Sequence, residues 1–69
     1  MHVELVLNYE GKEYRVGDEV LIDDNHGIIL SLNSGKLILD ASEPMMSRLL
    51  EYTIENIKTI YREGQSDKR

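Results

Sequence analysis

The sequence contains no cysteine, tryptophan or phenylalanine and only one proline among its 69 residues. Without cysteine the chain can form neither disulfides nor thiolate metal sites, which excludes zinc fingers and dithiol redox centres. A chain this short buries only about 60% of the surface that its unfolded form exposes, which leaves no room for a deep catalytic cleft. We therefore expect one domain, residues 1–63, stabilised by a single compact core or by self-association.

Basic residues are also scarce, with eight lysines and arginines against thirteen acidic residues and a formal charge of −5. Non-specific affinity for nucleic acids comes from basic side chains that neutralise phosphates, so this balance favours a basic partner instead. No apolar run approaches the roughly 18 residues that a membrane span needs, and the first residues lack the segments of a signal peptide. We expect a cytoplasmic protein that does not contact membranes.

Short apolar runs alternate with turn residues through the middle of the chain, a pattern typical of antiparallel strands. It predicts strands over Glu19–Ile22, His26–Leu32 and Lys36–Asp40, with turns at Asp23–Asn25 and Asn33–Gly35. Further strands are expected over His2–Asn8 and Lys12–Val16, and Tyr52–Arg62 is expected to be the final strand with a tight turn near Glu55–Asn56. Residues 64–69 are expected to be a disordered polar tail.

The hairpin 26–40 is apolar on both faces. A three-residue loop at 33–35 would place Leu32 opposite Lys36, Leu30 opposite Ile38 and Ile29 opposite Leu39. The two faces then carry Ile28, Leu30 and Ile38 on one side and Ile29, Leu37 and Leu39 on the other. An antiparallel sheet with one solvated face should alternate, so the second of these faces should be covered by a helix, by barrel closure or by another chain. We take its three residues as a candidate protein interface.

The segment Ser42–Pro44 resembles a helix start, because serine can cap the helix and proline is tolerated in the first turn. Met45 and Leu49 would then lie four residues apart on one helical face, as would Met46 and Leu50. The pattern predicts one short helix before the last strand. Exposed residues of this segment, Met45, Met46 and Arg48, are further interface candidates.

The segments Tyr14–Ile22, His26–Leu32 and Tyr52–Ile60 together resemble the small SH3-like barrels, including the KOW-type and Sm-like groups. In the KOW-type pattern a Gly-Asp-x-Val strand leads to a glycine that begins the next strand, as Gly17–Val20 and Gly27 do here. The resemblance implies a mainly β fold, a five-stranded SH3-like barrel that binds partners through loops and edge strands. Asp23–Asn25 replaces the basic loops with which these families contact RNA, and the Sm-like Asn and Arg-Gly positions have no counterpart.

No residue pattern indicates catalysis or a cofactor. His26 has no nearby nucleophile or second histidine in a catalytic arrangement, and no serine lies in a nucleophile motif. The acidic residues of the turns fit no calcium-binding loop and are expected to be solvated, namely Asp18, Glu19, Asp23, Asp24 and Asp40. We expect neither an enzyme nor a metal site.

The leading hypothesis is a non-enzymatic interaction module, a regulator or inhibitor that binds a basic protein or itself. Small acidic regulators of this kind, some of them from bacteriophages, provide the analogy. One alternative is KOW-like nucleic-acid binding through the basic residues Lys12, Arg15, Lys36 and Lys58. Another is capture of a small ligand, a nucleotide or a metabolite, where loops of two chains meet in an oligomer.

Overall fold

The computed structural model describes residues 5–62, and the expected disordered tail at 64–69 lies outside this part of the chain. The described residues form mainly strands, as the sequence predicts. These are β1 Val6–Tyr9, β2 Lys12–Arg15, β3 Glu19–Ile22, β4 Asn25–Asn33, β5 Lys36–Asp40, β6 Leu49–Thr53 and β7 Ile60–Arg62, with the 3₁₀ turn η1 Ile54–Asn56 before β7.

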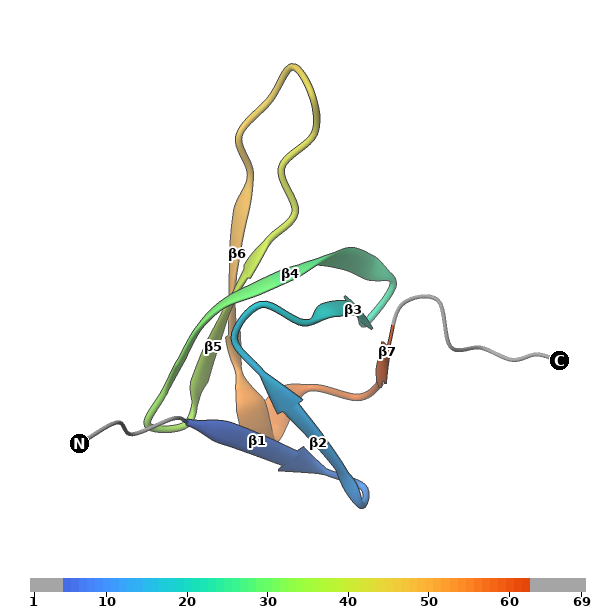
Figure 1. Cartoon of the computed structure of the whole chain (residues 1–69), viewed down its shortest axis with the longest axis vertical. Coiled ribbons are helices and arrows are strands. Elements are labelled where there is room, and N and C mark those ends of the chain that lie inside the picture. Colours follow the sequence, from blue (N-terminus) through green and yellow to red (C-terminus); the bar gives the residue numbers. More distant parts are fainter. Residues whose placement is uncertain (1–4, 63–69) are drawn as a thin grey trace, which may run out of the picture.

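Two antiparallel sheets share these strands (Figure 1). β1 and β2 form a two-stranded hairpin, and the other strands form a five-stranded sheet in the order β6-β5-β4-β3-β7. The successive strands β3 to β6 pair as a meander, and β7 returns to pair with β3 on the opposite edge. The described strands thus form two sheets and do not close into a single barrel.

Both sheets contribute to one hydrophobic core, which removes apolar surface from water and supplies most of the folding free energy. Its buried residues are Leu7, Tyr14, Val20, Ile22, Ile29, Leu32, Leu37, Leu39, Ala41, Ile57 and Ile60. The β1–β2 hairpin enters this core through Leu7 and Tyr14, and the segment after η1 closes it with Ile57 and Ile60. Among the described residues, the two sheets therefore share one core.

The turns follow the residue types of the sequence. Asp23 and Asp24 both have positive φ, 46° and 75°, as a two-residue turn between antiparallel strands requires. Aspartate tolerates this backbone region better than most residues. Asp23 also accepts hydrogen bonds from the backbone N–H groups of Lys58 and Thr59, at 3.1 and 2.9 Å from Oδ1, so this turn holds the entry to β7.

The expected three-residue loop between β4 and β5 is wrong. Asn33 pairs directly with Lys36 across a two-residue turn, so Leu32 lies opposite Leu37 and Ser31 opposite Ile38. The pairing then shifts between Ile29 and Ser31, with Leu30 as the extra residue of a β-bulge. This bulge restores the expected pairing of Ile29 with Leu39.

The helix predicted after Ser42 is also wrong. Glu43 and Met46 exchange backbone hydrogen bonds of 2.8 and 3.0 Å around Pro44 and Met45, which makes this segment a reverse turn. Met45 does not have a positive φ, so the turn is of type I, in which proline is favoured at the second position. That position has nearly helical φ and ψ, and therefore the same residues are typical of a helix start and of this turn.

Candidate functional site

The β5–β6 hairpin extends well beyond the sheet and is the most prominent projection of the molecule (Figure 1). Its pairing is continuous: the N–H of Ile54 donates to the carbonyl of Gly35 at 2.8 Å, and the N–H of Ala41 donates to that of Arg48 at 2.9 Å. The same register leads to the turn at Glu43–Met46. We call the projecting segment, residues 42–48, the arm.

Hydrogen bonds to side chains fix the base of the arm. The hydroxyl of Ser42 accepts a hydrogen bond from the backbone N–H of Arg48 at 3.0 Å, and the carboxylate of Asp40 accepts one from the N–H of Ser42 at 3.1 Å. Hydrogen bonding from the Ser42 hydroxyl, and then from its N–H, holds the pKa of Asp40 below its ordinary value. The arm is therefore a hydrogen-bonded ribbon with a defined direction.

The tip of the arm exposes two methionines. Met45 is 96% exposed and Met46 is 63% exposed, and every residue of the arm is exposed. Methionine is flexible and polarisable, so neighbouring methionines can adapt to the shape of a partner. The sequence identified Met45, Met46 and Arg48 as interface candidates, and the structure brings all three onto the arm.

Further apolar side chains lie on the outer face of the five-stranded sheet. Ile28 pairs with Asp40, and Asp40 pairs with Leu49, so these three side chains form one row across β4, β5 and β6. Leu30, in the bulge, is 48% exposed, and Ile28 and Leu49 are 43% and 58% exposed. We call Ile28, Leu30 and Leu49 the outer row.

The first set of interface candidates has a different place. Ile29, Leu37 and Leu39 are fully buried in the core, so the chain itself covers this face and the assignment of the three residues to a protein interface is wrong. The sequence separated the two faces of the hairpin as the structure does, but it could not show which face turns inward. The η1–β7 segment and the β1–β2 hairpin supply Ile57, Ile60 and other residues to the same core, and these are long-range contacts.

The four basic candidates are spread over three segments, with Lys12 and Arg15 at the two ends of β2, Lys36 at the start of β5 and Lys58 outside the strands. Lys12 follows the turn between β1 and β2, and Lys58 lies between η1 and β7. Arg15 contacts the carboxylate of Glu13 at 3.2 Å, and Lys36 lies 3.7 Å from that of Glu51. The two ion pairs reduce the positive charge available to phosphates, and this arrangement gives no support to nucleic-acid binding.

Two of the acidic turn residues, Asp18 and Asp23, have structural partners. Asp18 bonds to the backbone N–H of Arg15 at 2.9 Å and to the Arg62 side chain at 3.1 Å, and Asp23 bonds to the β7 entry as described above. Within residues 5–62 no three histidine or acidic side chains converge as metal ligands would. His26 is exposed on β4.

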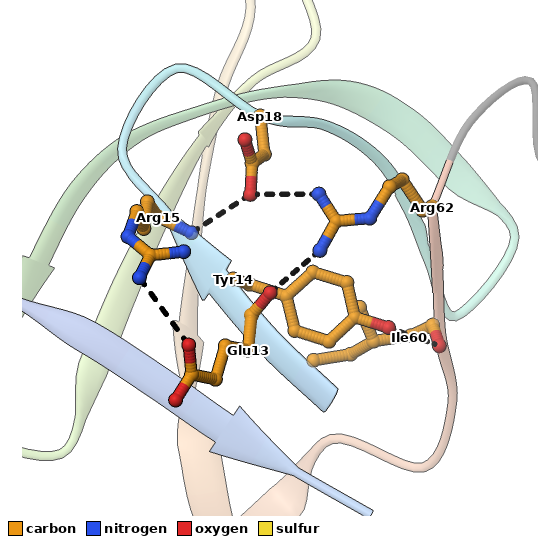
Figure 2. A network of polar contacts seen from close by, with 6 residues as sticks. All are labelled: Glu13, Tyr14, Arg15, Asp18, Ile60 and Arg62. Carbon is orange, nitrogen blue, oxygen red and sulfur yellow. Dashed lines mark hydrogen bonds and ion pairs between the residues drawn. The ribbon is translucent and has the colours of Figure 1, made fainter. Parts of the chain in front are cut away.

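Arg62 joins three parts of the chain in the polar network of Figure 2. Its guanidinium bonds to the carboxylate of Asp18 and to the backbone carbonyl of Glu13, and its central carbon lies 4.9 Å from the centre of the Tyr14 ring. A guanidinium over an aromatic face gains cation–π attraction. The network ties β7 to β2 and to the turn before β3, which is a structural role.

We expect Tyr14 to make the stability of the domain sensitive to alkali. Its hydroxyl donates to the carbonyl of Ile60 at 3.3 Å, and burial raises its pKa above the ordinary 10.0, although Arg62 opposes this shift. A raised pKa in the folded state means that the contribution to stability is complete below pH 10.0 and is lost as the pH rises through the folded value. We expect urea midpoints to fall above pH 10.0.

The Tyr14→Phe variant is the control for this titration, because it lacks the ionising hydroxyl. Its midpoint should fall less steeply with pH than that of the wild type, although burial also raises the pKa of Tyr9 and part of the decline should remain. Equal slopes for the two proteins would show that Tyr14 ionises as freely in the folded state as in the unfolded chain.

Neither protein-family models, nor curated proteins, nor solved structures give a match to this chain. No helix in the described part of the chain is long and apolar enough to cross a membrane. The assignment of the candidate site is therefore based on the geometry of this structure alone. The sequence analysis did not identify the outer row as a candidate interface. Its signal was indirect: if Ile29, Leu37 and Leu39 fill the core, the residues on the opposite face of the hairpin must be exposed.

Proposed function

We propose that this chain is a non-enzymatic protein-binding module that contacts its partner through the arm and the outer row. The observation that carries this proposal is the exposure of Met45 and Met46 at the end of a hydrogen-bonded ribbon. Exposed apolar side chains that gather on one projecting element favour contact with another protein. The charge of −5 favours a basic surface on that partner.

The arm and the outer row form one continuous element. Leu49 belongs to the outer row and directly follows Arg48, the last residue of the arm, while Asp40, at the base of the arm, lies between Ile28 and Leu49. A partner that covers the arm would therefore also reach the sheet. The interface would bury apolar side chains at the tip of the arm and place acidic side chains of the sheet beside them. Other protein interfaces likewise have an apolar centre and a polar rim.

We also propose that the fold is an open relative of the SH3-like barrel that the sequence resembles. The support is that β3 to β7 form five consecutive antiparallel strands around one core, with β7 returning to β3. Such a fold leaves edge strands and loops free for partners, as the resemblance implies. An experimental structure in which β6 also paired with β1 or β2 would show a closed barrel and would contradict the open form.

The double substitution Met45→Ser and Met46→Ser tests the proposed function. We expect its unfolding free energy to change by no more than about 0.5 kcal/mol, because the side chains are exposed, and partner capture to fall about tenfold or more. The measurement is affinity capture from a native lysate with quantitative mass spectrometry. Val16→Ser, at an apolar position 52% exposed between β2 and β3, is the matched control.

Capture by the wild type and by Val16→Ser, with loss in the double variant, would support the proposal. Equal capture by all three proteins would remove the arm from the interface. A chain that captures no protein and is monomeric by light scattering would contradict the function as a whole. Light scattering also tests the self-association that the sequence suggested.

A further inference from the structure

β6 is an open edge of the five-stranded sheet. It pairs with β5 on one side, and among residues 5–62 no other strand pairs with it. Antiparallel pairs alternate between hydrogen-bonded and non-hydrogen-bonded positions. The bonded pairs Gly35–Ile54, Ala41–Arg48 and Glu43–Met46 fix this alternation along the whole hairpin.

The alternation shows which backbone groups are open to a new strand. Leu50 and Tyr52 must occupy bonded positions opposite Leu39 and Leu37. The N–H and C=O groups of Leu49, Glu51 and Thr53 therefore point away from β5, to the free side of the strand. These groups have the spacing that an added β-strand requires.

The edge has few of the features that usually prevent strand addition. Protected edges carry proline, lysine, a bulge or a very short strand. β6 has five residues, no proline and a regular register, and its one charged side chain is Glu51. Glu51 lies 3.7 Å from Lys36 with both side chains more than half exposed, an ion pair worth roughly 0–1 kcal/mol.

Charge distinguishes a basic segment from a second copy of the chain. Along the β5–β6 hairpin and η1, the acidic residues Asp40, Glu43, Glu51 and Glu55 outnumber the basic residues Lys36 and Arg48. Pairing two copies would bring together two chains of charge −5. A lysine or arginine directly opposite Glu51 would instead gain a favourable cross-strand pair.

We propose that β6 accepts an extended basic segment of a partner protein as an added antiparallel strand, with a lysine or arginine opposite Glu51 and an apolar residue opposite Leu49. This inference rests on the proposed function and names the chemistry of its partner. The added strand would extend the sheet, and its apolar residues would continue the outer row from Ile28 and Leu49. The arm would then contact the partner beyond the end of the added strand.

Glu51→Pro tests the backbone pairing directly. Proline removes the N–H that points outward from residue 51, and an edge strand tolerates proline where the N–H faces solvent. Glu51→Ala removes the carboxylate and keeps the N–H. Glu13→Pro is the matched control, because Glu13 is an exposed glutamate on β2 whose N–H turns away from its partner Asn8 by the same alternation.

The probe is a displayed library of random peptides about ten residues long, enough to span a strand. We expect selection on the wild-type chain to enrich sequences in which a lysine or arginine lies two positions from an apolar residue, so that both face the side of the sheet that carries Glu51 and Leu49. Their affinity should fall about tenfold or more in Glu51→Pro and only about threefold in Glu51→Ala, and should be unchanged in Glu13→Pro. In the wild type, the amide protons of Leu49, Glu51 and Thr53 should become protected from exchange when a selected peptide is added.

Amide protection in the wild type tests the added strand even if the Glu51→Pro substitution lowers the folded fraction of that variant. Selected peptides that bind Glu51→Pro equally, or that leave those three amides unprotected, would overturn the inference, as would a failure to select any peptide. A dimer in light scattering that Glu51→Pro dissociates would assign the edge to a second copy and also overturn it. The proposed function fails separately, when the wild type captures no protein or the methionine variant captures it unchanged.

Discussion

Replacing Leu37 by alanine is expected to lower the free energy of unfolding by about 3 kcal/mol, within the range measured for buried leucines. Leu37 is fully buried and pairs with Leu32 on β4 and Tyr52 on β6, so its truncation leaves a cavity between three strands. A domain of this size has a total stability of roughly 3–10 kcal/mol. Urea unfolding followed by circular dichroism should show a much lower midpoint.

The matched control is Leu30→Ala, at a leucine that is 48% exposed in the bulge of β4. It should change the free energy of unfolding by less than about 1 kcal/mol, because less apolar surface is lost from the folded state. This pair of variants decides which face of the β4–β5 hairpin is the core. A larger loss for Leu30 than for Leu37 would reverse the two faces and return Leu37 to the candidate interface.

Replacing Gly27 by alanine is expected to destabilise the domain by about 2–3 kcal/mol through overpacking. A Cβ atom at this position would lie 2.4 Å from the carbonyl oxygen of Asp40 and 3.1 Å from the Cα of Ala41. These are backbone atoms of β5 and the residue after it, so no side-chain rotation can relieve the contact. β4 and β5 would have to separate at the base of the arm.

Thermal unfolding measures this effect, since 1 kcal/mol corresponds to roughly 4–8 °C for a domain of this size. We expect the midpoint of Gly27→Ala to fall by about 10 °C or more. His26→Ala is the control, because His26 is the exposed neighbour on the same strand and its loss should cost less than about 0.5 kcal/mol. If both variants had the same midpoint of thermal unfolding, β4 and β5 would not approach each other as closely as the structure shows.

Local sequence signals predicted the strands well where turn residues delimit them. The bounds of Glu19–Ile22 and Lys36–Asp40 are those of β3 and β5. Asp23 and Asp24 form the turn that their tolerance of positive φ favours. Such features depend on neighbouring residues, so a single sequence contains the information.

The register and the helix depended on information that neighbouring residues do not contain. Leu30 forms a bulge because the two-residue turn at Ser34–Gly35 displaces the pairing by one residue, and the bulge compensates for that displacement. The segment after Ser42 forms a turn because β6 pairs along β5, which stabilises an extended chain over Leu49–Thr53. Tertiary pairing of this kind overrides local helix signals.

Only part of the candidate site was predictable, because the rest also depends on tertiary pairing. Met45, Met46 and Arg48 were identified from composition and position, and they lie together on the arm. The open edge at Glu51 was not predictable, because it depends on which strand ends the sheet. That order follows from the return of β7 to β3, a contact between residues about forty positions apart.

Amide hydrogen exchange along β6 of the free protein, measured residue by residue by NMR, tests most directly that this edge is open. The amides of Leu50 and Tyr52, bonded to β5, should exchange slowly, while those of Leu49, Glu51 and Thr53 should exchange at close to the rate of unstructured peptides. Equal protection of all five amides would contradict an open edge and, with it, the proposed mode of partner binding.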